Sequence, residues 1–225
     1  MKRAKAAGLL RLFLPAPVWL LANFLLRRLL IRLGLGAADA AGLSALLLLP
    51  PLLVWYRDSA DAGRILPGRW TSWLLAGLCA VCAALSGGFF VRLFGAAPPV
   101  PARPLAILGL CFAAPAAEEV LCRGILLGRG RALLGTPLAF ALSVLLFAGA
   151  HLTPGAASAA LLFGAALGAI YLYGGSLLPP IFAHIGANCF ALLRPGALPR
   201  SLLPAGTLVL LGLTFAALVL RRRGR

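Results

Sequence analysis

The chain has 225 residues, of which 62% are hydrophobic and only 12% are charged. A soluble domain typically contains about 45–50% apolar and about 25% charged residues, so this composition excludes an ordinary soluble protein and indicates a membrane protein. The net charge of +16 would indicate nucleic-acid binding in a soluble chain. Here the basic residues flank apolar runs, as they do in membrane proteins, and we expect no nucleic-acid partner.

Eight apolar segments are expected to form helices. They cover residues 9–26, 37–56, 71–94, 104–127, 132–153, 156–173, 177–193 and 202–220. Helices are the default inside a bilayer because every backbone polar group must be satisfied within the protein, and no segment alternates with the period of a barrel strand. The sequence therefore predicts an all-α, polytopic transmembrane bundle of about eight spans, with seven as the alternative count, and a single transmembrane domain over residues 1–225.

Lysine and arginine residues are distributed unevenly between the two sides of this predicted bundle. With eight spans and a cytoplasmic N-terminus, fourteen of the 21 lie in cytoplasmic segments. The positive-inside rule therefore predicts that both termini are cytoplasmic, whereas seven spans would place the C-terminus on the other face. The Ala-, Leu- and Arg-rich composition is typical of a bacterial protein, so we expect an integral protein of the bacterial cytoplasmic (inner) membrane.

Two of the five acidic residues, Glu118 and Glu119, stand side by side inside the fourth segment. An ionised side chain near the bilayer centre costs about 2.5–3.5 kcal/mol on insertion scales, and such residues usually face a bundle interior or a wet cavity and have a function. The alternative is a helix end that emerges into water with two ordinary surface carboxylates. Arg123 follows Glu119 by four residues, which predicts an ion pair on one helical face and leaves Glu118 for chemistry.

Both histidines of the chain, His151 and His184, fall in later apolar segments. Asn188 follows His184 by four residues and therefore shares its helical face. A single histidine in an apolar helix is commonly a hydrogen-bonded structural residue. Together with Glu118, however, these two histidines are the strong proton-transfer groups in this half of the chain, which favours a shared site.

These residues form three motifs in chain order, which are EExxxR at 118–123, FxxxH at Phe147–His151 and HxxxN at His184–Asn188. This ordered set resembles the CPBP or Abi family, the type II CAAX prenyl endopeptidases and their bacterial relatives. The resemblance covers residues 104–193, the expected catalytic core. One departure is Cys122, where many relatives have an aromatic residue. The resemblance implies an intramembrane endopeptidase that acts on a membrane-embedded or lipid-associated protein or peptide.

The resemblance also implies a catalytic set and a supporting pair, namely Glu118, His151, His184 and Asn188, with Glu119 and Arg123 in support. Glu118 would be the general base for a water molecule that His151 helps to hold. His184 and Asn188 would donate hydrogen bonds to the oxyanion. No cofactor is favoured. Zinc is the alternative, because two histidines and a glutamate are a common zinc ligand set, although the chain has no HExxH motif.

Two other functions stay open. Intramembrane Glu, His and Arg also mark proton pathways, which makes a proton-coupled transporter the main rival, but we find no inverted repeat of the kind that transporters contain. The second is a non-catalytic immunity or scaffold protein of the same family. The identity of the substrate is open as well, since prenylated proteins, bacteriocin precursors, signal-like peptides and the tails of surface proteins are all candidates.

Overall fold

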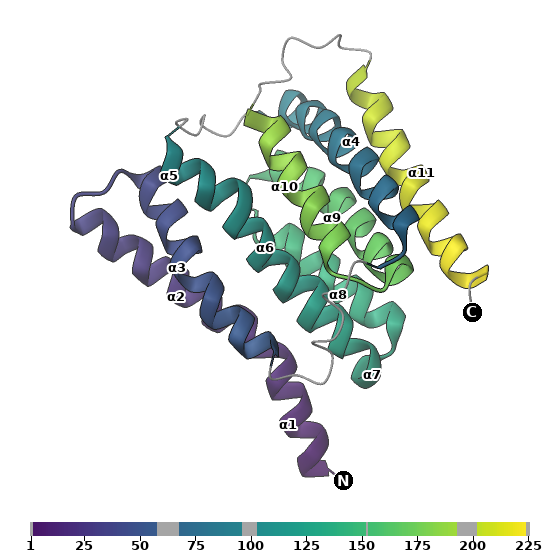
Figure 1. Cartoon of the computed structure of the whole chain (residues 1–225), viewed down its shortest axis with the longest axis horizontal. Coiled ribbons are helices and arrows are strands. Elements are labelled where there is room, and N and C mark those ends of the chain that lie inside the picture. The colour runs from purple at the N-terminus through teal and green to yellow at the C-terminus, as the bar shows by residue number, and fades with distance from the viewer. Residues whose placement is uncertain (1, 58–67, 96–102, 152, 193–201, 224–225) are drawn as a thin grey trace. The chain divides into compact units, whose positions relative to one another are not determined.

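Figure 1 shows a computed structural model of the chain, which describes residues 2–57, 68–95, 103–151, 153–192 and 202–223. These residues form helices and contain no strand, which confirms the predicted all-α architecture. The chain divides into two compact units. Unit 1 comprises Met1–Ala62 and Val100–Leu142, and unit 2 comprises Gly63–Pro99 and Ser143–Arg225.

Unit 1 is built from three N-terminal helices and one long helical stretch. The N-terminal helices are α1 (Lys2–Phe13), α2 (Pro15–Arg32) and α3 (Ala37–Arg57). The long stretch runs without a break through α5 (Pro104–Ile107), the π-helical η2 (Leu108–Ala113), α6 (Ala114–Glu119), the π-helical η3 (Val120–Arg129) and α7 (Gly130–Leu134). Helix α3 packs between α2 and this stretch, so the segment that carries both glutamates is buried against α3.

Unit 2 is a group of helices around α4 (Trp70–Phe94). Helices α9 (Pro154–Gly174), α10 (Leu178–Leu192) and α11 (Leu202–Arg223) all contact α4, and α9 also contacts α10 and α11. Figure 1 shows these four helices side by side. Helix α8 (Thr136–Gly149) belongs to unit 1 up to Leu142 and to unit 2 from Ser143 onward.

All eight predicted apolar segments are helical, and six of them are long and apolar enough to cross a membrane among the residues described. Helices α8 and α10 are shorter. The 14 residues of α8 span about 21 Å at 1.5 Å per residue, less than the roughly 30 Å of a hydrocarbon core. The chain is therefore an integral membrane protein in which α8 is shorter than the hydrocarbon core is thick.

Several predicted boundaries were wrong. The first segment does not stop at residue 26, because α2 continues to Arg32. The fourth segment does not stop at residue 127, because the helix continues to Leu134 and ends at Gly135, whose φ of +79° breaks the helical path. Residues 128–131, predicted as a break, lie inside the helix because Gly130 packs closely: a Cβ there would lie 3.1 Å from that of Ala139. The fifth segment does not reach residue 153, since α8 ends at Gly149.

A close approach of two glycines sets the position of the glutamate-bearing stretch against α3. A Cβ added to Gly109 of η2 would collide with the backbone of Gly42 in α3, and one added to Gly42 would meet the backbone of Leu105 and Ala106. Small residues of this kind let helices in a membrane pack at close range. This close crossing of the two helices therefore requires glycine at both positions.

Candidate active site

Glu119 and Arg123 form a buried ion pair in unit 1. Nη1 of Arg123 donates to Oε1 of Glu119 at 2.8 Å, and neither side chain has any exposed surface. The pair predicted from the four-residue spacing is therefore present. The two opposite charges lie one helical turn apart, so the ion pair that is buried in the interior has no net charge.

Glu118 has a different environment from its neighbour. It is partly exposed, whereas Glu119 is completely buried. Successive residues of a helix point about 100° apart, so the Glu118 carboxylate leaves the helix in a different direction from the Glu119–Arg123 pair. Helix α6, which ends at these glutamates, is flanked on both sides by the π-helical η2 and η3. Such π segments occur frequently at functional sites.

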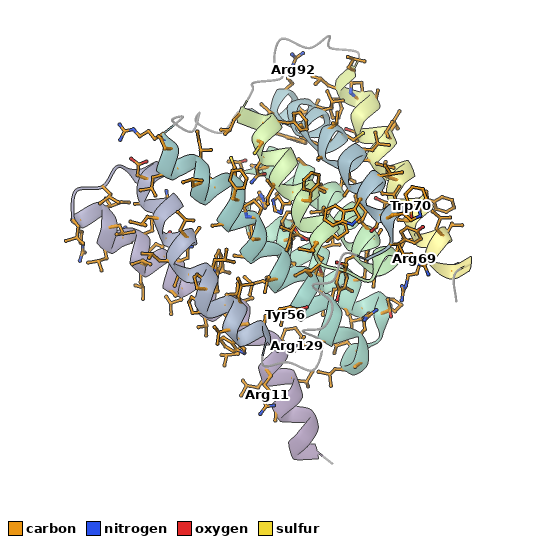
Figure 2. All side chains as sticks on the ribbon, viewed as in Figure 1. Arg11, Tyr56, Arg69, Trp70, Arg92 and Arg129 are labelled. Carbon is orange, nitrogen blue, oxygen red and sulfur yellow. The ribbon has the colours of Figure 1, made fainter. Side chains whose placement is uncertain are left out.

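The end of α3 packs beside Arg123 and holds η3 in place. A Cβ on Gly124 would lie 2.8 Å from Cε2 of Tyr56, which is completely buried. The guanidinium of Arg129 lies 6.0 Å from the centre of the Tyr56 ring and donates to the carbonyls of Trp55 and Tyr56 (Figure 2). These contacts were not predicted from the sequence. Gly124, the residue after the motif arginine, is the feature that could have indicated close packing at this position.

His151 lies just after α8, not within a helix as predicted. Its Nδ1 is 2.8 Å from the carbonyl oxygen of Phe147, and its backbone N–H donates to the carbonyl of Ala148. A carbonyl can only accept, so Nδ1 carries the hydrogen, and in the neutral form of the ring Nε2 is the acceptor. The side chain thus satisfies one of the carbonyls left over at the end of the helix and its orientation is fixed.

His184 of α10 is only 3% exposed and lies against two phenylalanine rings. Its ring centre is 5.3 Å from that of Phe147, at an interplanar angle of 80°, and 5.3 Å from that of Phe163, at 88°. Phe147 also lies 5.1 Å from the ring of His151. Phe147, the first residue of the FxxxH motif, therefore has two roles. Its carbonyl accepts a hydrogen bond that orients the His151 ring, and its own ring contacts both histidines.

The predicted site residues thus form two groups, one in each unit. Glu118, Glu119 and Arg123 lie on one helical stretch of unit 1, and unit 2 brings His151 and His184 together around Phe147. Asn188, which is half-buried, follows His184 by one turn of α10. Among the described residues, no three His, Cys, Asp or Glu side chains gather as a metal-ligand set.

Comparison with known proteins identifies the part of the chain that carries all three motifs. Residues 100–190 match the family model described as type II CAAX prenyl endopeptidase Rce1-like. The similarity to that family covers this part of the chain. The Rce1-like region begins before α5 and ends within α10, so it contains both groups of site residues. No curated protein and no solved structure matches the chain.

Proposed function

We propose that the protein is an intramembrane endopeptidase in which Glu118 activates a water molecule. Its substrate is a membrane-embedded or lipid-associated protein or peptide. The observation that carries the proposal is the contrast between two adjacent carboxylates. Glu119 forms a buried ion pair with Arg123, whereas Glu118, the residue before it, is partly exposed. The family match over residues 100–190 supports peptide hydrolysis as the reaction class.

In the proposed reaction the Glu118 carboxylate accepts a proton from water while the water oxygen bonds to the carbonyl carbon of the scissile peptide. The tetrahedral intermediate carries its negative charge on the former carbonyl oxygen. Its C–N bond then breaks, and the leaving nitrogen takes the proton from Glu118. General base catalysis by a positioned carboxylate typically contributes about 10²–10⁴ to the rate.

The groups of unit 2 supply the remaining polar contacts in this proposal. With Nδ1 of His151 donating to Phe147, its Nε2 is left to accept a hydrogen bond from the attacking water. His184 and the Asn188 amide, one turn apart, donate to the oxyanion. Removal of one such donor typically lowers the rate by about 10²–10³.

The decisive experiment compares peptides released from membranes that contain the wild type or Glu118→Gln. Asp39→Asn is the matched control, because it also converts a carboxylate to an amide, and Asp39 pairs with Arg103 at 3.0 Å outside the proposed site. We expect a set of cleaved membrane peptides with the wild type and the control that is lost with Glu118→Gln. Equal cleavage by all three would contradict the proposal.

The proposal also requires Glu118 and His184 to act on the same peptide bond. Residues that act as a unit show strongly non-additive losses. The double variant Glu118→Gln/His184→Gln should therefore be hardly slower than Glu118→Gln alone. Rate losses that multiply in full would show that the two residues act independently.

The mechanism as proposed needs no metal ion. Purified protein should keep its activity after exhaustive chelation and contain no stoichiometric zinc by elemental analysis. Activity that returns only when zinc is added would overturn the carboxylate mechanism, while a metal-dependent peptidase would still explain the family match.

We further propose that the protein lies in a bacterial inner membrane with both termini in the cytoplasm. The excess of Lys and Arg in the segments on that side supports this orientation. Reporter fusions after residues 33 and 223 test it: the first should report the periplasm and the second the cytoplasm. The same location for both fusions would contradict the orientation.

A further inference from the structure

Phe163 of α9 belongs to none of the three motifs, yet it contacts the buried histidine directly. Its ring centre lies 5.3 Å from that of His184 at an angle of 88°, and 6.3 Å from that of Phe147 at 65°. Phe163 is itself only 8% exposed. Three helices of unit 2 therefore meet at His184: α8 through Phe147, α9 through Phe163, and α10, which carries the histidine.

We propose that Phe163 is a positioning residue that holds the imidazole of His184 in its working orientation. Edge-to-face contacts with centres 4.5–7 Å apart are the geometry that aromatic rings prefer. One phenylalanine alone would still allow the imidazole to turn about its bond to Cβ. Two nearly perpendicular contacts, from Phe147 and from Phe163, restrict that rotation.

The inference rests on the proposed role of His184 as a donor to the oxyanion. Such donors act at 2.7–3.1 Å from the oxyanion, and a working site tolerates errors of only about 0.5 Å or 10–20°. A side chain that contacts His184 but not the substrate can therefore change the rate. Because the oxyanion exists only in the transition state and the intermediate, loss of Phe163 should lower kcat and leave KM unchanged.

The first experiment does not depend on activity. The chain contains only two histidines, so protein with isotope-labelled histidine gives two sets of imidazole NMR signals, which His151→Gln and His184→Gln assign. Aromatic rings shift the signals of nuclei that lie near them. Phe163→Leu should move the His184 signals and leave those of His151 in place, while Phe147→Leu should move both.

Unchanged His151 signals also show that Phe163→Leu still folds. The control is Phe190→Leu, which replaces an exposed phenylalanine of α10 and should move neither set. His184 signals that stay in place in Phe163→Leu would overturn the proposal. Since this result is independent of peptide cleavage, it separates a failure of the Phe163 inference from a failure of the proposed function.

The second experiment asks whether Phe163 acts through His184. Phe163→Leu should lower kcat about tenfold, and Phe163→Tyr, which keeps the ring, should stay close to the wild type. In a His184→Gln background Phe163→Leu should cause no further loss, because coupled residues are non-additive. The same tenfold loss in that background, or an unchanged kcat in Phe163→Leu, would overturn the positioning role.

Discussion

Nη1 of Arg123 lies 2.8 Å from Oε1 of Glu119, and both side chains are fully buried. The adjacent carboxylate, Glu118, is partly exposed. Two neighbouring residues of the same type therefore differ in burial: Glu119 is fully buried in an ion pair, and Glu118 is partly exposed. This difference leads to distinct and measurable consequences for the two glutamates.

Removing one member of the buried pair should destabilise the protein, and removing both should restore much of the loss. Glu119→Leu leaves the Arg123 charge buried without its partner, which typically costs about 3–5 kcal/mol. The double variant Glu119→Leu/Arg123→Met replaces the pair by apolar groups and should recover most of that stability. Thermal unfolding of the purified variants in detergent measures both effects. A double variant as unstable as Glu119→Leu would contradict this view of the pair.

Glu118→Gln should separate activity from stability. The substitution keeps the size of a partly exposed side chain, so the melting temperature should stay close to that of the wild type. Peptide cleavage should fall by about 10²–10⁴, the usual contribution of a general base. Glu119→Gln should lower both quantities, because it breaks the buried pair. Equal loss of stability in the two variants would argue against the division of roles.

Substitutions of His151 can distinguish its two ring nitrogens. The amide nitrogen of asparagine can take the place of Nδ1 and donate to the Phe147 carbonyl, but asparagine has nothing at the position of Nε2. His151→Asn should therefore keep the stability and lose cleavage. His151→Leu also loses the hydrogen bond, worth about 0.5–1.5 kcal/mol, and should melt at a lower temperature than His151→Asn. Wild-type cleavage by His151→Asn would show that Nε2 is not needed.

Gly109→Ala should destabilise the protein because the new methyl group meets the backbone of Gly42. Overpacking of an interior contact typically costs about 1–3 kcal/mol, and here the obstacle is backbone, which cannot turn aside as a side chain can. The control is Gly77→Ala on α4, where a Cβ has no neighbour within 4 Å and alanine favours the helix. Similar melting temperatures for the two variants would contradict the predicted close crossing.

Much of the fold could be predicted from where apolar runs meet glycine and proline. The segment predicted at 37–56 is α3, Ala37–Arg57, and the one predicted at 156–173 is α9, Pro154–Gly174. The same reasoning failed at residues 128–131, where glycines and arginines looked like a loop. Gly130 packs against Ala139 and Leu12, and contacts with other helices leave no trace in local composition.

The candidate site was predictable only where its contacts are local. The Glu119–Arg123 pair follows from a spacing of four residues on one helix. The contact of Phe163 with His184 joins helices α9 and α10 and has no such spacing, so no local pattern selects this phenylalanine among the twelve of the chain. The apolar sequence around His151 predicts a helix there. In the structure His151 follows α8, and its side chain caps the end of that helix by a hydrogen bond to the Phe147 carbonyl.

The position of Glu119 and Arg123 on one helix has a consequence for the biogenesis of the protein. Both residues emerge from the ribosome within a few residues of each other and can neutralise one another before any later helix exists. The pair can therefore enter the membrane without net charge. His184, in contrast, is held by Phe147 and Phe163 from two other helices, so its surroundings are complete only after α10 has been synthesised and packed. The two halves of the proposed catalytic apparatus should mature at different times during assembly.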